Sequence, residues 1–222
     1  MKNWLTVVIP CKNEGELLIE TIRSIGEDVN IVVADSSTDS TPDLLRSEFP
    51  EVFLVPGGLP AQARNNGANM VQTPYTLFLD ADMDISKINL SGIVSDMIKN
   101  DLDLVTCRIA VRGKYGLLYY AFYLVQNIIS LLTPFAVGGF MLFRTESFSQ
   151  CGGFDSRDKF AEDYHLSMKI SPDRFKIYHS PAYTSDRRLR NKSAWYMIKQ
   201  MTLCWFNRNN PDFYQKDYGY WQ

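Results

Sequence analysis

The 222-residue sequence has neither a basic excess nor a cysteine pattern, and each absence excludes a class of protein. Lysine and arginine number 23 against 25 acidic residues, for a net charge of −2. Nucleic-acid-binding domains usually carry a basic footprint, so we expect no nucleic-acid partner. Cys11, Cys107, Cys151 and Cys204 are too far apart for metal-ligand spacing, and a chain of this length needs no disulfide framework. We expect reduced thiols in a cytoplasmic protein.

The sequence also lacks a long uninterrupted apolar run. Residues 1–10 pass into a polar motif without a cleavage site, so we expect no signal peptide. The longest apolar stretch, 117–137, contains Gln126, Asn127 and Pro134, which argues against a membrane span. There is no internal repeat or low-complexity linker. At 45% hydrophobic residues, the chain can form one substantial core.

The first hundred residues alternate between strand-like and helix-like patterns. Asn13 could cap the first helix, with Glu16 as its capping-box partner. Continuous apolar strands between helices predict an α/β fold with a Rossmann-like, mostly parallel central sheet covered on both faces. Strands are expected at Leu5–Pro10, Ile31–Ala34, Val52–Val55 and Thr76–Leu79, with helices beginning near Asn13, Thr41 and Ala61.

The second half of the chain is less regular. Its aromatic-rich segment 116–132 has a helical pattern, and the tail after Asn207 matches no element. The other expected helices are Ile88–Lys99, Phe160–Ile170 and Ser193–Phe206, and the expected strands are Leu104–Ile109, Ala136–Arg144 and Phe175–Tyr178.

Polar residues follow three of the expected strands, where parallel sheets bind ligands. They are Asn13 and Glu14, Asp35 and Asp39, and Asp80 and Asp82.

The Asp80-Ala-Asp82 motif predicts a metal site. On an extended chain, two carboxylates one residue apart point to the same side. They could therefore hold one Mg²⁺ or Mn²⁺ against a diphosphate. The alternative is an acidic turn that caps the next helix.

Asp35 could accept a hydrogen bond from a base N–H or a ribose hydroxyl. Its alternative role is an Asx-turn that opens the loop, and Asp39 reads as a turn or cap residue.

Several motifs, in order, resemble those of the family-2 glycosyltransferases. Their order over residues 5–170 is more specific than any single one. They are Val-Val-Ile-Pro10-Cys-Lys-Asn13-Glu14, Val-Val-Ala34-Asp35-Ser-Ser-Thr-Asp39, Ala63-Arg64-Asn65-Asn66-Gly67, Phe-Leu-Asp80-Ala-Asp82, Gly152-Gly153-Phe154-Asp155 and Glu162-Asp163.

The resemblance implies a glycosyltransferase-A type fold in a single domain, 1–222. Residues 1–100 would bind the nucleotide sugar, and 101–222 would form a smaller acceptor-side subregion and a C-terminal helix. The implied activity is metal-dependent, inverting transfer of a hexose-type sugar to a hydroxyl acceptor, a glycan or a lipid-linked molecule. A UDP-sugar is the favoured donor, and Mn²⁺ or Mg²⁺ the cofactor.

The resemblance also implies roles for individual residues. Pro10, Asn13 and Glu14 would line the nucleotide pocket, Asp35 would contact the base, and Arg64 would lie beside the nucleotide. Asp82 would bind the metal, with Asp80 close to the ribose or the metal. Asp163 would be the catalytic base, and Glu162 would orient either Asp163 or the acceptor. The alternative for both residues is a pair of acids that is favourable at a helix N-terminus.

The sequence departs from the family pattern at two points. Ala34 stands where the first aspartate of a pair is common, and the Gln-x-x-Arg-Trp motif of processive synthases is absent. The second departure argues against polymer synthesis.

Two further groups could meet the diphosphate. Arg187 and Arg188 lie in a basic segment that could close over it, because arginine suits bidentate phosphate recognition. The alternative is a solvated charge run. His179 could approach the metal or diphosphate. His165 reads as an acceptor-side group or as a hydrogen-bonded structural histidine.

The aromatic segment 115–133 could lie on a membrane surface or hold a lipid-linked acceptor. The protein would then sit at the inner face of the membrane. Packing in the core or in a homodimer is the alternative.

Two other functions remain open at this point. The Phe-Leu-Asp80-Ala-Asp82 motif also resembles the nucleophile motif of haloacid-dehalogenase-type phosphohydrolases, although here two to three βα units precede it. A non-catalytic sugar-nucleotide-binding protein of the same fold is the other rival.

Overall fold

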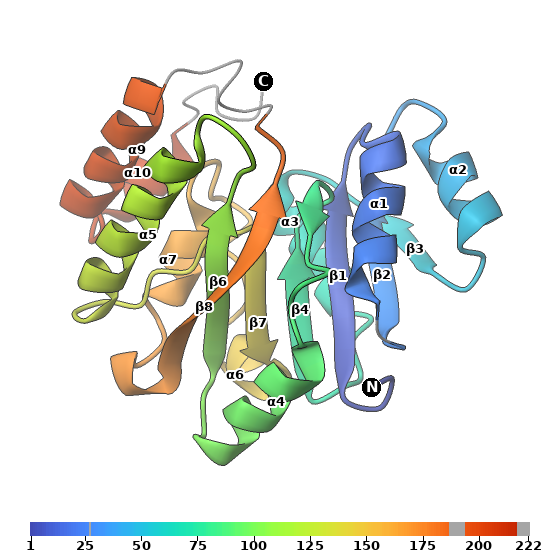
Figure 1. The fold of residues 1–222 in the computed structure, drawn as a ribbon, viewed down its shortest axis with the longest axis horizontal. Coiled ribbons are helices and arrows are strands. Elements are labelled where there is room, and N and C mark those ends of the chain that lie inside the picture. Colours follow the sequence, from blue (N-terminus) through green and yellow to red (C-terminus); the bar gives the residue numbers. More distant parts are fainter. Residues whose placement is uncertain (27, 187–193, 217–222) are drawn as a thin grey trace.

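The structure, a computed structural model, describes residues 1–26, 28–186 and 194–216. The described strands form one eight-stranded sheet in the order β3-β2-β1-β4-β7-β6-β8-β5, with helices on both faces (Figure 1). The strands are β1 (Leu5–Cys11), β2 (Asn30–Asp35), β3 (Phe53–Pro56), β4 (Tyr75–Leu79), β5 (Met83–Asp84), β6 (Leu104–Ala110), β7 (Phe140–Arg144) and β8 (Phe175–Thr184). The helices are α1 (Gly15–Ile25), α2 (Thr41–Glu48), α3 (Pro60–Ala68), α4 (Leu90–Lys99), α5 (Gly116–Ser130), α6 (Thr145–Gln150), α7 (Glu162–Ser167), the 3₁₀ helix η1 (Pro172–Arg174), α9 (Ala194–Phe206) and α10 (Pro211–Gln215).

The central strands are buried on both faces, as their continuous apolar sequences predict. Side chains alternate between the two faces of a strand. Val7 and Ile9 of β1 therefore pack in the core cluster that contains residues of α1 and α4, whereas Val8 packs in the cluster with residues of α3, α6 and α7. Phe78 of β4 anchors the second cluster, with its ring centroid 4.8 Å from that of Phe148 and 5.0 Å from that of Phe154.

The βα alternation of the first half gives the expected parallel pairing of β3, β2, β1 and β4. The second half joins this sheet through β7, which is antiparallel to both β4 and β6. The pairing places Leu79 opposite Phe140. It brings the residues just before β7 to the carboxyl end of β4, where the backbone N–H of Asp80 donates to the carbonyl oxygen of Gly139 at 3.4 Å.

Four local predictions were wrong. The strand predicted over 175–178 is the longer β8, which includes His179 and ends at Thr184. Glu14, not Asn13, is the N-cap residue of α1, because Asn13 has φ of 56° and its side-chain oxygen accepts from the Thr38 N–H instead. The strand predicted from 136 begins at Phe140. The helix predicted over 160–170 is the shorter α7, which follows Ala161 in the left-handed region at φ of 52°.

The tail after Asn207, which the sequence pattern did not assign, contains α10. Tyr214 of this helix is fully buried and stacks on His165 of α7, with ring centroids 4.4 Å apart. The Lys159 N–H donates to the carbonyl oxygen of Tyr214 at 2.8 Å. The C-terminal part of the chain therefore supports α7 directly.

Among the described residues, no helix is both long and apolar enough to cross a membrane.

Close packing of α3 on β1 gives a first prediction. A Cβ added at Gly67 would lie 2.3 Å from Cγ1 of Val8, inside van der Waals contact. We expect Gly67→Ala to lower the free energy of unfolding by about 1–3 kcal/mol, the usual cost of overpacking. Urea denaturation measures the change.

A double-mutant cycle provides the control. Val8→Ala removes the clashing methyl groups, so the double variant should lose less stability than the sum of the two single changes. Additive losses would show that the contact between α3 and β1 is not the cause.

Candidate active site

A buried arginine forms the centre of the candidate site. Arg64 of α3 is 1% exposed and donates two charged hydrogen bonds. Its Nη1 donates to Oε1 of Glu162 at 2.5 Å, and its Nη2 donates to Oδ1 of Asp80 at 2.7 Å. Asp80 ends β4 and Glu162 begins α7, so the guanidinium joins both halves of the chain. The Phe154 ring lies 5.5 Å from Cζ of Arg64 and covers it.

Asp163 lies beside this arginine and is held by backbone donors. Its Oδ2 accepts from the Gly138 N–H at 2.6 Å, and its Oδ1 accepts from the Tyr164 N–H at 2.8 Å. A Cβ at position 138 would lie 2.8 Å from Nη2 of Arg64 and 3.2 Å from Oδ2 of Asp163. Glycine is therefore required where this loop enters the site.

The cluster has more acidic than basic groups, because one guanidinium lies beside three carboxyl groups. Burial raises the pKa of Glu162 to about 7, although Arg64 opposes the shift, and the neighbouring Asp163 adds to it. Burial likewise raises the pKa of Asp163 against the opposing effect of Arg64. For Arg64, burial lowers the pKa, but the charges of Asp80 and Glu162 outweigh it and the net pKa is raised. Arg64 therefore stays charged, and Glu162 and Asp163 retain protons more strongly than in water.

Asp80 and Asp82 do not share a partner. The chain turns at Ala81 and Asp82 directly after β4, so the extended geometry assumed for the motif was wrong. Asp80 faces Arg64, whereas Oδ2 of Asp82 accepts from Ser185 Oγ at 2.6 Å and from Thr184 Oγ1 at 3.2 Å. Over residues 1–26, 28–186 and 194–216, no cluster of three or more histidine, cysteine or acidic side chains is arranged to hold a metal. The oxygen atoms that surround Asp82 are nonetheless of the hard type that Mg²⁺ and Mn²⁺ prefer.

The loops after β1 and β2 are bonded to each other. Oδ1 of Asp35 accepts from the N–H and the hydroxyl of Ser37, at 3.2 and 2.6 Å, so the Asx-turn suggested as its alternative role is present. The Asn13 N–H donates to Ser37 Oγ at 2.7 Å. Pro10 lies in β1 opposite Ala34, and Glu14 begins α1. Asp35 also lines a cavity of about 260 Å³ with Pro42, Arg46, Leu54, Val55 and Pro56.

Comparison with known proteins identifies the family of this chain. The profile named "Glycosyl transferase family 2" matches residues 6–152, about two thirds of the sequence. The chain belongs to glycosyl transferase family 2.

Individual relatives and structures agree with this family. Uncharacterised glycosyltransferases of Mycobacterium tuberculosis and Mycobacterium bovis are 31% identical over 105 residues, which are 47% of this chain and 48% of theirs. The matched segment thus spans about half the length of these relatives. S. aureus TarS in complex with UDP has a TM-score of 0.65 at 20% identity, over 83% of this chain and 60% of that chain. The mannosyltransferase PcManGT from Pyrobaculum calidifontis has a TM-score of 0.64 at 22% identity, over 86% of this chain and 61% of that chain. These structures confirm the predicted fold.

Membership of family 2 decides between two interpretations of the Phe-Leu-Asp80-Ala-Asp82 motif. It supports the glycosyltransferase and not the haloacid-dehalogenase-type phosphohydrolase. The geometry agrees, because Asp80 forms an ion pair with Arg64 instead of standing alone as a nucleophile.

The structure also reveals neighbours of the family motifs that the sequence did not assign. Thr184 and Ser185 approach Asp82 because the end of β8 pairs with β5, with Thr184 opposite Met83. No local sequence signal marks these hydroxyl groups. Gly138 falls inside the strand expected over 136–144, and its contact with Asp163 depends on the antiparallel placement of β7.

Of the three residues predicted to meet the diphosphate, the structure describes His179 alone. Arg187 and Arg188 lie outside the part of the chain that the structure describes. His179 contacts Tyr123 of α5 through its Nδ1, 3.2 Å from the tyrosine hydroxyl, and lies five residues before Thr184 on β8. His165 is hydrogen bonded through Nδ1 to Asp158 at 2.6 Å, as its structural alternative predicted.

The raised pKa of Glu162 gives a pH-dependent prediction. Its ordinary value is 4.5 and its folded value is about 7. Between these values the folded protein holds a proton that the unfolded chain has released, so the free energy of unfolding should fall as the pH rises. The fall amounts to at most about 3 kcal/mol. Urea denaturation over this pH interval measures it.

Glu162→Gln removes the titrating group and should flatten that dependence. Glu146 is exposed on α6, so Glu146→Gln should leave the wild-type slope in place. An unchanged slope in the Glu162→Gln variant would contradict the assignment.

Proposed function

We propose that the chain transfers a sugar, with inversion, from a nucleoside-diphosphate sugar to a hydroxyl acceptor, using Mn²⁺ or Mg²⁺. The observation that carries this proposal is the position of Asp163. This carboxylate is fixed by the Gly138 N–H beside the Arg64–Asp80 ion pair, at the carboxyl end of β4. The candidate base, Asp163, therefore lies next to the end of β4, which belongs to the proposed nucleotide-binding half.

The cavity at the ends of β2 and β3 suits a nucleoside. Apolar side chains with a few placed polar groups are typical of such pockets. Asp35 would accept hydrogen bonds from a base or ribose, and Arg46 adds a positive charge at the same cavity. The TarS structures contain UDP or UDP-GlcNAc, and the PcManGT structure contains GDP-Man and Mn²⁺. These ligands support a nucleoside-diphosphate sugar, and we favour a UDP-sugar.

Asp82, with Asp80 beside it, would hold the cation. Thr184 and Ser185 fix one oxygen of Asp82 through their hydroxyls, which orients its carboxylate. When bound, the metal supplies positive charge that stabilises the departing diphosphate.

The reaction is a single displacement at the anomeric carbon. The acceptor oxygen forms a bond to this carbon from the face opposite the diphosphate, and the acceptor proton passes to the carboxylate of Asp163. The bond from the anomeric carbon to the β-phosphate oxygen breaks, and its electron pair leaves with the nucleoside diphosphate. Because burial raises the pKa of Asp163, its carboxylate is a stronger base than that of a solvent-exposed aspartate and takes the acceptor proton more readily.

Glu162 and Arg64 would act as positioning residues. Their ion pair fixes the first turn of α7 against α3, and this turn carries Asp163. The acceptor, a glycan or a lipid-linked molecule, would approach from the side of α7. The roles of Arg187, Arg188 and His179 at the diphosphate remain predictions.

Asp163→Asn tests the base directly. Loss of a general base usually costs about 10²- to 10⁴-fold in rate, so we expect a loss of this size in transfer with donor binding retained. Release of nucleoside diphosphate in the presence of acceptor measures the rate, and calorimetry measures donor binding. Asp173→Asn, on exposed η1, is the matched control and should keep wild-type activity.

Two results would count against the proposal. Wild-type transfer by the Asp163→Asn variant would remove Asp163 as the base. Donor binding by the wild-type protein without transfer to any of a panel of glycan and lipid-linked acceptors would favour a non-catalytic binding protein.

Metal and donor binding form a separate test. At one hundred times its Kd, a nucleotide that binds only the folded state should raise the melting temperature by about 5–10 °C. We expect this shift with UDP and Mn²⁺, a smaller one with GDP, CDP or dTDP, and its loss with a chelator. Asp82→Asn should lose the Mn²⁺-dependent part, whereas Asp212→Asn, at an exposed position of α10, should not. Equal shifts with and without metal would argue against the cation site.

A further inference from the structure

Helix α5 exposes an apolar surface and buries the amide group of Gln126 on its opposite face. Seven of the fourteen large hydrophobic side chains that are exposed in the described residues lie on α5 and the two residues after it. Leu117 is 82% exposed, Ile128 66% and Leu131 78%. We call these seven residues the α5 stripe: Leu117, Tyr120, Leu124, Val125, Ile128, Leu131 and Leu132.

The spacing of the stripe follows one face of a helix over four turns. The opposite face packs on the protein, where Tyr119 is buried against Val111. There Gln126 is also buried and its amide donates to the carbonyl oxygen of Phe135 at 2.7 Å. An ordinary surface helix has the reverse arrangement, with its polar face in water. A contiguous exposed patch of this kind indicates a binding surface.

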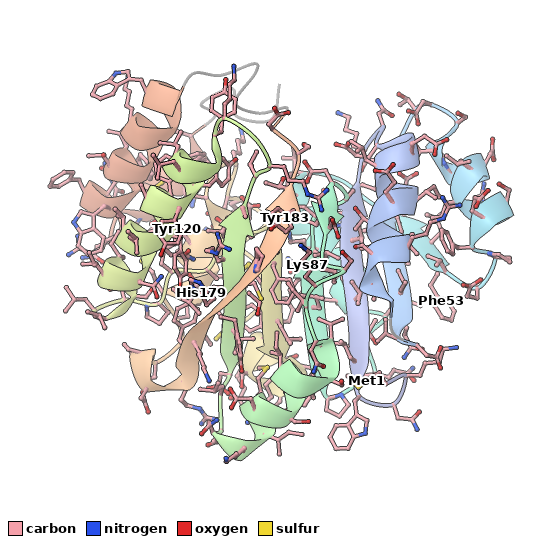
Figure 2. All side chains as sticks on the ribbon, in the orientation of Figure 1. Met1, Phe53, Lys87, Tyr120, His179 and Tyr183 are labelled. Atoms are coloured by element: carbon pink, nitrogen blue, oxygen red, sulfur yellow. The ribbon has the colours of Figure 1, made fainter. Side chains whose placement is uncertain are left out.

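The charge around the stripe indicates the partner. The chain has a net charge of −2, yet residues 104–145 contain no acidic residue and four cations. Arg112 and Arg144 form ion pairs with acids outside this segment. Arg108 and Lys114 lie beside the stripe and form no ion pair among the described residues. Cζ of Arg108 lies 5.7 Å from the ring centroid of Tyr120, and Nζ of Lys114 lies 4.7 Å from that of Tyr115. Arg108 also contacts β8, because its Nε donates to the carbonyl oxygen of His179 at 3.1 Å; Tyr120 and His179 are labelled in Figure 2.

Tyrosines and cations that flank an apolar face are typical of a membrane interface, and the local positive charge matches anionic headgroups. We propose that the α5 stripe docks this protein on the surface of an anionic lipid bilayer.

The dimensions of α5 agree with docking along the surface. Its 15 residues give a length of about 22 Å, below the roughly 30 Å of the hydrocarbon core. A second copy of the chain is a poorer partner. In a symmetric dimer the stripe would face the same surface of the second copy, and that surface offers Arg108 and Lys114 no acidic partner within residues 104–145.

The stripe is connected to the candidate active site. After Leu132 the chain reaches Gly138, whose N–H holds Asp163, within six residues, a span of at most about 20 Å. The same segment is tied to α7, because the Ala136 N–H donates to Ser167 Oγ at 3.2 Å. A docked stripe would therefore hold Asp163 close to the headgroups, within reach of a hydroxyl acceptor carried on a lipid. This last consequence rests on the proposed function.

Vesicle co-sedimentation of the full chain tests the docking. We expect binding to vesicles of phosphatidylcholine mixed with phosphatidylglycerol, weaker binding to phosphatidylcholine alone, and a decrease at high salt. Ile128→Glu should lower the partition coefficient about tenfold or more, the factor that matches the lost apolar burial of one isoleucine.

Ile98→Glu is the matched control, because Ile98 is also exposed, at 51%, on the helix α4. It should bind vesicles like the wild type, and thermal melts should show that both variants fold. Changing Arg108 and Lys114 together to glutamine should reduce the preference for phosphatidylglycerol.

Vesicle binding by the Ile128→Glu variant at the wild-type level would overturn the proposal, as would an equal loss in the Ile98→Glu variant. A dimer in sedimentation velocity that the Ile128→Glu change dissociates, without vesicle binding, would show that a second copy covers the stripe. The measurement needs neither donor nor acceptor. Asp163→Asn should bind vesicles normally, so failure of the docking and failure of the proposed chemistry can be told apart.

Discussion

The site depends on one buried cation that is shared by several carboxylates. Removing a guanidinium from water is costly, and the cost is offset only when charged hydrogen bonds replace the lost solvent. Arg64 forms these bonds with Asp80 and Glu162, which lie 16 and 98 positions away in the chain. Each partner belongs to a different element, so α3, the end of β4 and the start of α7 are held in one arrangement. The position of Asp163 follows, because it is the next residue of the same helical turn.

The topology makes this arrangement possible. A purely parallel extension of the sheet would carry the start of the next strand to the opposite edge from Asp80. The antiparallel β7 instead begins beside the carboxyl end of β4, and the loop before it passes between Arg64 and Asp163. Only glycine at position 138 leaves room for both side chains. The first and second halves of the chain therefore share one sheet and one set of charges.

The sequence allowed prediction of the elements that depend on local pattern. The alternating strands and helices, the polar strand ends at Asp35 and Asp80, and the family itself follow from periodicity and motif order, and fold and family are confirmed. What failed depended on turns and long-range pairing. The prediction that the carboxylates of Asp80 and Asp82 point to the same side required an extended chain, whereas the structure has a turn there. Ser185 reaches Asp82 from 103 residues away, through a strand pairing that no local pattern encodes.

The burial of Tyr214 has a consequence for the order in which the molecule becomes complete. The Tyr214 ring stacks on His165, and the Tyr214 carbonyl oxygen accepts from the Lys159 N–H. The helix that contains Asp163 therefore packs on residues that are synthesised about fifty positions later. On a ribosome, residues 1–100 would emerge and could fold first, while α7 would still lack its supporting neighbour. The first turn of α7, with Asp163, would be held in place only after the segment that carries Tyr214 has been made and has packed.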